Sequence, residues 1–388
     1  MTATIDSAKT RAREIVDGNG AALVALSHRI HGCPELKFEE HRTSAWTAGA
    51  LTDAGLTIDA GIADLPTAFS CRIGSGPLHL AICAEYDALP GLGHACGHNI
   101  IAAAAVGAGL ALAPLVDDLG LTVTVIGTPA EEGGGGKQML IDRGAFAGMH
   151  AAMMVHPTPR EDLYPRVTAT AIIQVAYEGR AAHAALAPHL GINAADAMTV
   201  AQVAIGLLRQ HLRPGEQVHG FVANGGSAPN VVPDYTEGTW MARAPRLEDL
   251  AGLRPRVHHC FEAGALATGA TVAITPGSPD YAHMEHDHDL GELFRANARA
   301  LGRPESADGE TTFSTDMGNV SLAMPAIHPC LAIDTGGAVN HQPGFTEAAV
   351  NASADRAVME GALGMAWTAI DLAVGPLRDR LLGSTTSA

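Results

Sequence analysis

The feature that most constrains this chain is a change of pattern near residue 165. Before it, short apolar runs typical of strands alternate with stretches whose apolar residues recur at helical intervals. Such alternation predicts β-α-β units, and therefore a layered sheet with helices on its faces. Between residues 168 and 275 the order becomes strand, helix, two strands, helix and strand, which predicts a small sheet covered by two helices. We therefore expect one domain inserted into another.

The first pattern resumes after the insertion, with a helix, a strand near 326–334 and a long terminal helix. We therefore predict an α/β domain, made of residues 1–166 and 279–388, that has a mixed sheet covered by helices. It is interrupted by a smaller α+β domain of residues 167–278. The length of 388 residues agrees with two domains at roughly 150 residues each.

Composition removes several classes of function. The chain has 24 Lys and Arg against 41 Asp and Glu, a net charge of −17, which opposes binding to nucleic acid or to an anionic membrane. The most apolar stretch, 100–116, is rich in Ala and Gly and falls short of the ~18 residues that a membrane span needs, so it predicts a buried helix. No signal-peptide pattern opens the chain, and its six cysteines are scattered, so we expect a cytoplasmic protein.

The first motif that carries chemistry is G-H-A-C-G-H-N over residues 93–99, between a predicted strand and the buried helix. Cys96 and His98 lie two residues apart at the start of that helix, where a thiolate and an imidazole can bind one metal ion. Taken alone, the pair is equally consistent with a structural cysteine beside a core histidine.

Further ligand types follow other predicted strands. Glu131 and Glu132 come after the strand over 121–128 and repel each other unless a cation binds, because no Lys or Arg adjoins them. His156 follows the next strand, and His341 lies in a glycine-rich loop. With the thiolate and imidazole they form a set suited to one or two divalent ions, with positions left for water and substrate. The set is Cys96, His98, Glu132, His156 and His341.

A histidine-rich segment, H-M-E-H-D-H-D over 283–289, offers a second place for a metal. Histidine content alone is compositional, however. We favour a polar junction at which a helix begins, with Asp287 or Asp289 as its N-cap.

Five longer motifs occur in a fixed order along the chain. They are A-E-Y-D-A-L-P (84–90), C-G-H-N (96–99), P-A-E-E-G-G-G-G-K (129–137), A-P-N-V-V-P-D (228–234) and S-T-D-M-G-N-V-S (314–321). On these motifs the chain resembles metallopeptidase family twenty, the aminoacylase and carboxypeptidase-G branch. Within it, the chain is similar to the amidohydrolases that include p-aminobenzoyl-glutamate hydrolase and auxin-conjugate hydrolases. The auxin branch usually has Asp where this chain has Asn99, which favours the aminobenzoyl-glutamate side.

The resemblance implies a catalytic α/β domain that holds two divalent metal ions per subunit, Mn²⁺ or Zn²⁺. The five residues of the set above are then the metal ligands. Glu131 is implied as the general base, and Asp87 as the residue that orients a ligand. Glu85 receives no definite role.

The resemblance also implies that the inserted domain is a lid that commonly pairs two subunits into a homodimer. There, His183 corresponds to a histidine donated to the partner's active site, where it stabilises the oxyanion and contacts substrate. Asn230 and Arg243 correspond to residues that bind the substrate's carboxylate, for which the fork of an arginine is well suited.

We therefore predict a metal-dependent amidohydrolase of the metallopeptidase type. Its expected substrates are N-acyl amino acids or dipeptides, with p-aminobenzoyl-glutamate first and β-alanyl or other dipeptides next. The alternative is a catalytically silent member that serves as a small-molecule-binding or regulatory dimer. The intact Glu131 beside a full ligand set argues against that alternative.

Overall fold

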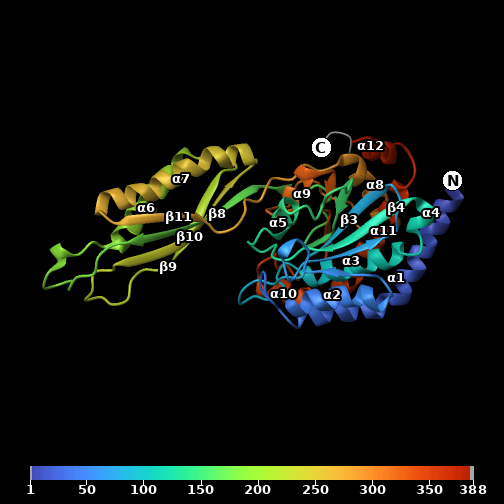
Figure 1. Ribbon diagram of the computed structural model, residues 1–388, viewed down its shortest axis with the longest axis horizontal. Helices are drawn as coiled ribbons and strands as arrows, with labels where there is room; N and C mark the ends of the chain where they lie inside the picture. The colour runs from blue at the N-terminus through green and yellow to red at the C-terminus, as the bar shows by residue number, and fades with distance from the viewer. Residues whose placement is uncertain (1, 385–388) are drawn as a thin grey trace. The chain divides into compact units, whose positions relative to one another are not determined.

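The computed structural model describes residues 2–384 and divides into two compact units (Figure 1). Unit 2 comprises residues 167–283, and unit 1 comprises the described residues on either side. We expected the insertion to end at residue 278. It extends further because Tyr281 and Thr170 exchange two backbone hydrogen bonds of 2.9 Å.

Unit 1 is built on a six-stranded mixed sheet. Its strands are β1 (Asp59–Ala60), β2 (Phe69–Ile73), β3 (Leu78–Ala84), β4 (Leu121–Gly127), β5 (Ala151–Met153) and β13 (Ala326–Ile327). Their order across the sheet is β1-β2-β4-β3-β5-β13. β3 pairs in parallel with β4 and β5, and β13 with β5, whereas β2 is antiparallel to β1 and β4. The carboxyl ends of β3, β4 and β5 therefore meet at one edge.

Helices surround this sheet. They are α1 (Thr2–His31), α2 (His41–Asp53), α3 (His98–Leu112), α4 (Val116–Leu119), α5 (Gly136–Asp142), α8 (His288–Ala300), α9 (Met317–Ala323), α10 (Pro343–Ala348), α11 (Ala352–Leu372) and α12 (Pro376–Ser384). The shorter elements are the 3₁₀ helix η1 (Ile62–Asp64) and the strands β6 (His156–Thr158), β7 (Arg166–Val167), β12 (Thr312–Phe313) and β14 (Cys330–Ala332).

Helix α3 lies at the centre of unit 1, and all of its residues except Leu110 are buried. Glycine lets it approach its neighbours closely. A Cβ at Gly107 would lie 2.7 Å from the Cβ of Ala362 on α11, and one at Gly109 would lie 2.6 Å from Cγ2 of Val125 on β4. The predicted buried helix is confirmed, but it ends at Leu112. Ala113 is still helical and donates to the carbonyl of Gly109, but Pro114 has no N–H to continue this pattern, which explains that end.

Among the described residues, no single helix has both the length and the apolar character needed to cross a membrane. A bent pair, Ala352–Leu372 with Pro376–Gly383, meets those criteria only when its two helices are taken together. Most of α11 is buried in the core of unit 1.

Unit 2 is a four-stranded antiparallel sheet, in the order β11-β8-β10-β9, packed against two helices (Figure 1). Its elements are β8 (Ala169–Glu178), η2 (Pro188–Leu190), α6 (Ala194–Leu208), η3 (Arg209–His211), β9 (Gln217–Asn224), β10 (Tyr235–Ala244), α7 (Leu247–Thr268) and β11 (Thr271–Pro276). Strand β10 buries every second residue, as expected of a sheet with one face on a core. The predicted α/β fold class with a smaller α+β unit is confirmed.

The strand predicted near 326–334 is in fact two strands, β13 and β14, separated by His328 and Pro329. β13 extends the six-stranded sheet, whereas β14 pairs in parallel with β6. Proline cannot donate a ladder hydrogen bond, which explains the break. The carbonyl of Pro329 instead accepts a hydrogen bond of 2.9 Å from the backbone N–H of His156, where the neighbouring strand is also interrupted.

Candidate active site

Potential metal ligands gather at the edge where the parallel strands end. Asp87 follows β3, and Glu131 and Glu132 follow β4. His156 comes shortly after β5, and His98 is the first residue of α3. Open α/β sheets place their ligand sites at this carboxyl edge, so the topology brings together residues that are far apart in the sequence.

Two groups of potential ligands share one cysteine. The first is Cys96, His98 and His156, and the second is Cys96, Glu132 and His341. Within each group, one ligand atom from each residue lies within 4.8 Å of the others. The structure therefore brings together all five residues that the sequence suggested as ligands. A cysteine common to both groups can serve two neighbouring ions.

Asp87 supports both groups. One oxygen, Oδ1, lies 2.9 Å from Nδ1 of His98, and the other accepts a 2.8 Å hydrogen bond from the backbone N–H of Glu132. Burial lowers the pKa of His98, but the Asp87 carboxylate outweighs burial and raises it well above its ordinary value. With Nδ1 protonated toward Asp87, Nε2 of His98 is the nitrogen available to a metal.

His156 is suited to metal binding in a different way. Its Nδ1 lies 2.9 Å from the carbonyl oxygen of Pro157, so this nitrogen carries the proton and Nε2 has the lone pair. Burial lowers the pKa of His156 to about 4. The ring is therefore neutral at pH 7, which is the form that binds metals.

The backbone just before Glu131 is held in an uncommon conformation. Ala130 has φ of 61°, a left-handed geometry that costs a non-glycine residue about 1–2 kcal/mol. Its N–H donates a 2.9 Å hydrogen bond to Oε1 of the buried Glu40, whose other oxygen accepts a 3.0 Å bond from Thr67. These contacts fix the direction in which Glu131 leaves the strand. Strain of this kind is characteristic of functional sites.

Several buried atoms here lack a hydrogen-bond partner. They include Oε2 of Glu85, Nε2 of His98 and Oε1 of Glu132. Burial, followed by the charges of Glu85 and Glu132, raises the pKa of Glu131 well above its ordinary value. Leaving such groups unpaired costs about 1–3 kcal/mol each, and a divalent cation would satisfy them together. The donor set therefore fits divalent metal ions.

In unit 2, the predicted substrate histidine is exposed and has a defined tautomer. Nδ1 of His183 accepts hydrogen bonds from the backbone N–H groups of Ala185, at 3.2 Å, and Leu186, at 3.1 Å. The ring proton of the neutral imidazole therefore lies on Nε2, which is the donor left to contact another molecule.

The other two predicted residues of unit 2 differ from each other in setting. Asn230 is exposed, and its carbonyl accepts a 3.0 Å hydrogen bond from Ala184, which places it beside the His183 segment. Arg243 lies half-buried on β10, 3.2 Å from His219 and 3.3 Å from Thr170. The structure thus brings Asn230 close to His183, and it holds Arg243 among polar neighbours on the sheet.

Sequence reasoning missed His328, which lies between β13 and β14. Its ring is fully buried, neither ring nitrogen has a hydrogen-bond partner, and its centroid is 5.3 Å from that of His156. Phe313 lies 5.4 Å from the same ring. The available signal was its position after a parallel strand at the site edge, the argument that identified His156.

The histidine-rich segment over 283–289 begins a helix, as we favoured. Oδ1 of Asp287 accepts a 2.9 Å hydrogen bond from the N–H of Leu290, so Asp287 is the N-cap of α8. Arg380 binds the same carboxylate at 2.7 and 2.8 Å. Among the residues that the structure describes, this segment contributes to none of the metal-binding groups.

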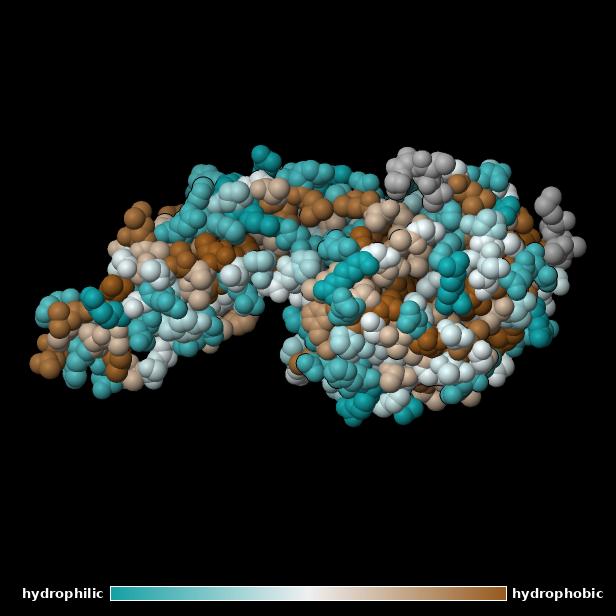
Figure 2. All heavy atoms as spheres, viewed as in Figure 1, coloured by the Kyte–Doolittle hydropathy of each residue, from teal (hydrophilic) through white to brown (hydrophobic). Residues whose placement is uncertain are grey.

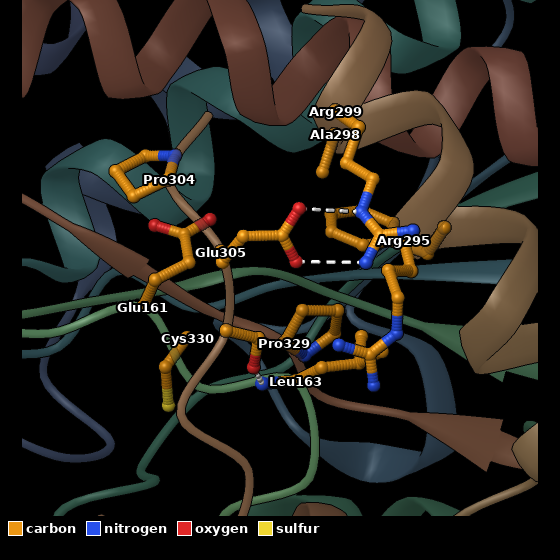
Figure 3. Close-up of a pocket in the computed structure, with 11 residues that line it drawn as sticks. Glu161, Leu163, Arg295, Ala298, Arg299, Pro304, Glu305, Pro329 and Cys330 are labelled. Atoms are coloured by element: carbon orange, nitrogen blue, oxygen red, sulfur yellow. Dashed lines mark hydrogen bonds and ion pairs between the residues drawn. The ribbon is translucent and has the colours of Figure 1, made fainter. Parts of the chain in front are cut away.

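Two cavities of unit 1 lie elsewhere. Figure 3 shows the first, beside α8, where Arg299 and Glu305 are joined by hydrogen bonds of 2.8 and 2.7 Å. Its volume of about 20 Å³ accommodates about one water molecule. The second, about 310 Å³, is an open groove lined by residues that include Arg72 and Arg143. Neither contains a predicted site residue, so the ligand groups define the candidate active site.

A profile of the family described as Peptidase family M20/M25/M40 matches residues 81–358, which span every member of the ligand groups. The chain belongs to this family. The predicted family and enzyme class are thereby confirmed, and the protein is a hydrolase of the metallopeptidase type. Family membership and the donor set together support divalent metal ions.

Two curated relatives bear on the reaction. The chain is 38% identical to Xaa-Arg dipeptidase of Mus musculus over 397 residues, covering 96% of this chain and 91% of the relative. It is 34% identical to one of the subunits of p-aminobenzoyl-glutamate hydrolase of Escherichia coli over 310 residues, covering 74% of this chain and 64% of the relative. Both relatives are named for the cleavage of small amides.

Two solved structures have the same fold. A dinuclear metal-binding peptidase of the M20 family from Bacillus subtilis aligns with a TM-score of 0.68 at 20% identity, over 92% of this chain and 99% of the other. An aminobenzoyl-glutamate utilization protein from Klebsiella pneumoniae aligns with a TM-score of 0.70 at 18% identity, over 89% and 97%.

Proposed function

We propose that this enzyme hydrolyses the amide bond of dipeptides or N-acyl amino acids, with two divalent ions per subunit and Glu131 as the general base. The observation that carries the proposal is the pair of ligand groups that share Cys96, placed directly beside Glu131. When bound, the ions supply an acidified water and polarise the scissile carbonyl.

Glu131 and Glu132 divide two tasks in this mechanism. Glu132 belongs to a ligand group, so its carboxylate would be engaged by a bound cation. Glu131 accepts the proton of the attacking water and passes it to the departing amine. Burial, and then the nearby carboxylates, raise the pKa of Glu131 well above its ordinary value.

Unit 2 recognises the substrate and the developing charge. His183 presents a Nε2–H donor, which suits an oxyanion. Arg243, with Asn230, binds the substrate's carboxylate.

We propose that unit 2 also forms the contact of a homodimer, in which His183 serves the partner's active site. Large apolar side chains that are exposed gather in this smaller unit, and Figure 2 shows apolar surface there. Exposed apolar patches of this kind mark protein interfaces. The exposed apolar residues of unit 2 are Leu186, Leu190, Val203, Leu207, Phe221, Tyr235 and Leu266.

For the substrate, we propose dipeptides with a C-terminal basic residue first and p-aminobenzoyl-glutamate second. This order reverses the sequence-based preference. Its support is the higher identity and coverage toward a relative named Xaa-Arg dipeptidase. The net charge of −17 also favours the approach of a cationic substrate over an anionic one.

The test is amine release from a matched panel, with apo-protein loaded in parallel with Mn²⁺ or Zn²⁺. The panel contains Xaa-Arg and Xaa-Glu dipeptides, p-aminobenzoyl-glutamate and an N-acetyl amino acid. We expect hydrolysis, with the highest kcat/KM for Xaa-Arg. A higher kcat/KM for p-aminobenzoyl-glutamate would overturn the substrate order. If nothing is released from protein that holds two metals, the silent binding dimer becomes the better account.

A further inference from the structure

A buried lysine contacts Glu85, whose carboxylate lies near His98, and this lysine has no task in the mechanism above. Lys137, in the first turn of α5, is fully buried. Its Nζ lies 2.5 Å from Oε1 of Glu85 and 2.7 Å from Oδ1 of Asp316. Its backbone N–H donates a 2.9 Å hydrogen bond to the other oxygen of Asp316. One ammonium group therefore holds two carboxylates, and no side chain of the three is exposed.

The carboxylate of Glu85 is only half satisfied by this arrangement. Oε1 is bound by Lys137, whereas Oε2 is buried and has no hydrogen-bond partner. Oε2 instead lies 3.4 Å from Nε2 of His98. That nitrogen also has no hydrogen-bond partner. Glu85, His98 and Glu131 form a third group whose ligand atoms lie within 4.8 Å of one another.

A hydrogen bond does not account for the contact between Glu85 and His98. The 3.4 Å separation is longer than the 2.7–3.2 Å, approximately, of an N–H···O bond. Nδ1 of His98 is directed to Asp87, so Nε2 is the nitrogen that faces Glu85. Two ligands that each stand about 2.1 Å from a tetrahedral ion lie about 3.4 Å apart. The separation that is too long for a hydrogen bond is thus the separation expected for two ligands of one ion.

We propose that Glu85 is a further metal ligand, sharing with Nε2 of His98 one of the two ions, and that Lys137 positions its carboxylate. Lys137 fixes Oε1, which directs Oε2 toward His98. The lysine also offsets one negative charge in a region crowded with carboxylates. The inference rests on the proposed function, because it requires that divalent ions occupy the ligand groups.

The experiment measures metal binding rather than turnover. Apo-protein is titrated with Mn²⁺ by calorimetry and with Co²⁺ by visible absorption, which reports coordination. Wild type is expected to bind two ions. Glu85→Gln keeps the shape and removes the charge, and it should weaken one of the two ions about 10–100-fold and alter the Co²⁺ spectrum. The matched control is Glu305→Gln, which removes a carboxylate from an exposed ion pair in the same unit and should change neither ion.

Two further variants distinguish the positioning of the Glu85 carboxylate by Lys137 from the effect of the total charge around the ion. Lys137→Met releases Glu85 and should weaken the same ion as Glu85→Gln. Asp316→Asn keeps Lys137 on Glu85 and should change that ion by less than about threefold. Circular dichroism and thermal melting check that each variant folds. If Lys137→Met does not fold, the metal affinity of Glu85→Gln alone tests whether Glu85 is a ligand.

The outcomes distinguish this inference from the proposed function. Wild type that binds no divalent ion would refute the proposed function. Two ions in wild type with unchanged affinity and spectrum in Glu85→Gln would overturn the inference alone and make Glu85 a structural partner of Lys137.

Discussion

Most site residues of the two units differ in their setting, although His341 of unit 1 is exposed and Arg243 of unit 2 is half-buried. In unit 1, the ligand residues His98 and His156 are buried, and each has one ring nitrogen hydrogen-bonded to a protein oxygen. In unit 2, His183 and Asn230 are exposed, and only the backbone fixes them. Rigid placement by buried partners suits ions that must be held within tenths of an ångström. Exposed residues suit contacts that form only when another molecule or subunit is present.

The largest effect expected in unit 1 is at Glu131. Glu131→Gln should lower kcat about 100- to 10,000-fold, because the water proton loses its acceptor. Metal content, measured by elemental analysis, should stay at the wild-type value. Near-normal turnover in the metal-loaded variant would remove Glu131 from the role of base.

The second-largest effect is expected at His183, and it tests whether a residue of unit 2 takes part in the reaction catalysed in unit 1. His183→Ala should lower kcat about 100-fold by loss of an oxyanion donor, with metal affinity unchanged. His189→Ala, an exposed histidine nearby in the same unit, is the control and should have little effect.

A mixing experiment tests whether His183 serves the partner. Reassembled mixtures of His183→Ala and Glu131→Gln subunits should recover about a quarter of wild-type activity, since half of the dimers would hold one intact site. If the mixture stays inactive while the subunits exchange, His183 acts within its own chain.

A smaller effect should follow from Arg243. Arg243→Ala should raise KM about 10-fold or more for a dipeptide with a free carboxylate, because a charged hydrogen bond is lost. The corresponding C-terminal amide serves as the comparison and should show little change. Equal losses on both substrates would exclude carboxylate binding by this residue.

The smallest effect on the reaction, but a visible one on stability, is expected at Glu40. Burial, with the Asp87 carboxylate, raises the pKa of Glu40 from 4.5 to about 7. Because the folded state keeps this proton longer, the free energy of unfolding of the apo-protein falls as pH rises from 4.5 to 7, by about 3 kcal/mol.

Glu40→Gln should remove that fall while keeping an oxygen that accepts from Ala130. Urea unfolding of the metal-free protein at pH 5, 6, 7 and 8 measures it. An unchanged pH profile would mean that Glu40 is ionised in the folded protein throughout this range.

The difference between the units also explains how far the sequence could be interpreted. The strands and helices of unit 2 follow the order predicted from periodicity, because elements such as β10 and α7 pack one face on the core of that unit. Most of the ligand set was accessible, since Glu132 and His156 come after strands and His98 begins a helix at the same edge, whereas His341 lies in a loop. The break at Pro329 was missed because apolar residues lie on both sides of His328 and Pro329, so the sequence predicts one strand over 326–334.

Long-range pairing was out of reach of local patterns. Lys137 meets Glu85 and Asp316 across separations of 52 and 179 residues, and no periodicity encodes which buried carboxylate finds which ammonium. The position of His328 after a strand was a local signal, but its contact with the ring of His156 joins two different strands and could not be predicted locally. The tautomer of His183 likewise depends on the turn that follows it.

The paired hydrogen bonds between Thr170 and Tyr281 have a consequence for the order of folding. In the unfolded chain, the two parts of unit 1 are separated by a loop of about a hundred residues, and closing such a loop carries an entropic penalty that grows with its length. Once unit 2 has folded, its ends stand one strand spacing apart, about 5 Å. The folded insertion then acts as a short connection between the two parts of unit 1. Early folding of unit 2 should therefore accelerate assembly of the ligand groups.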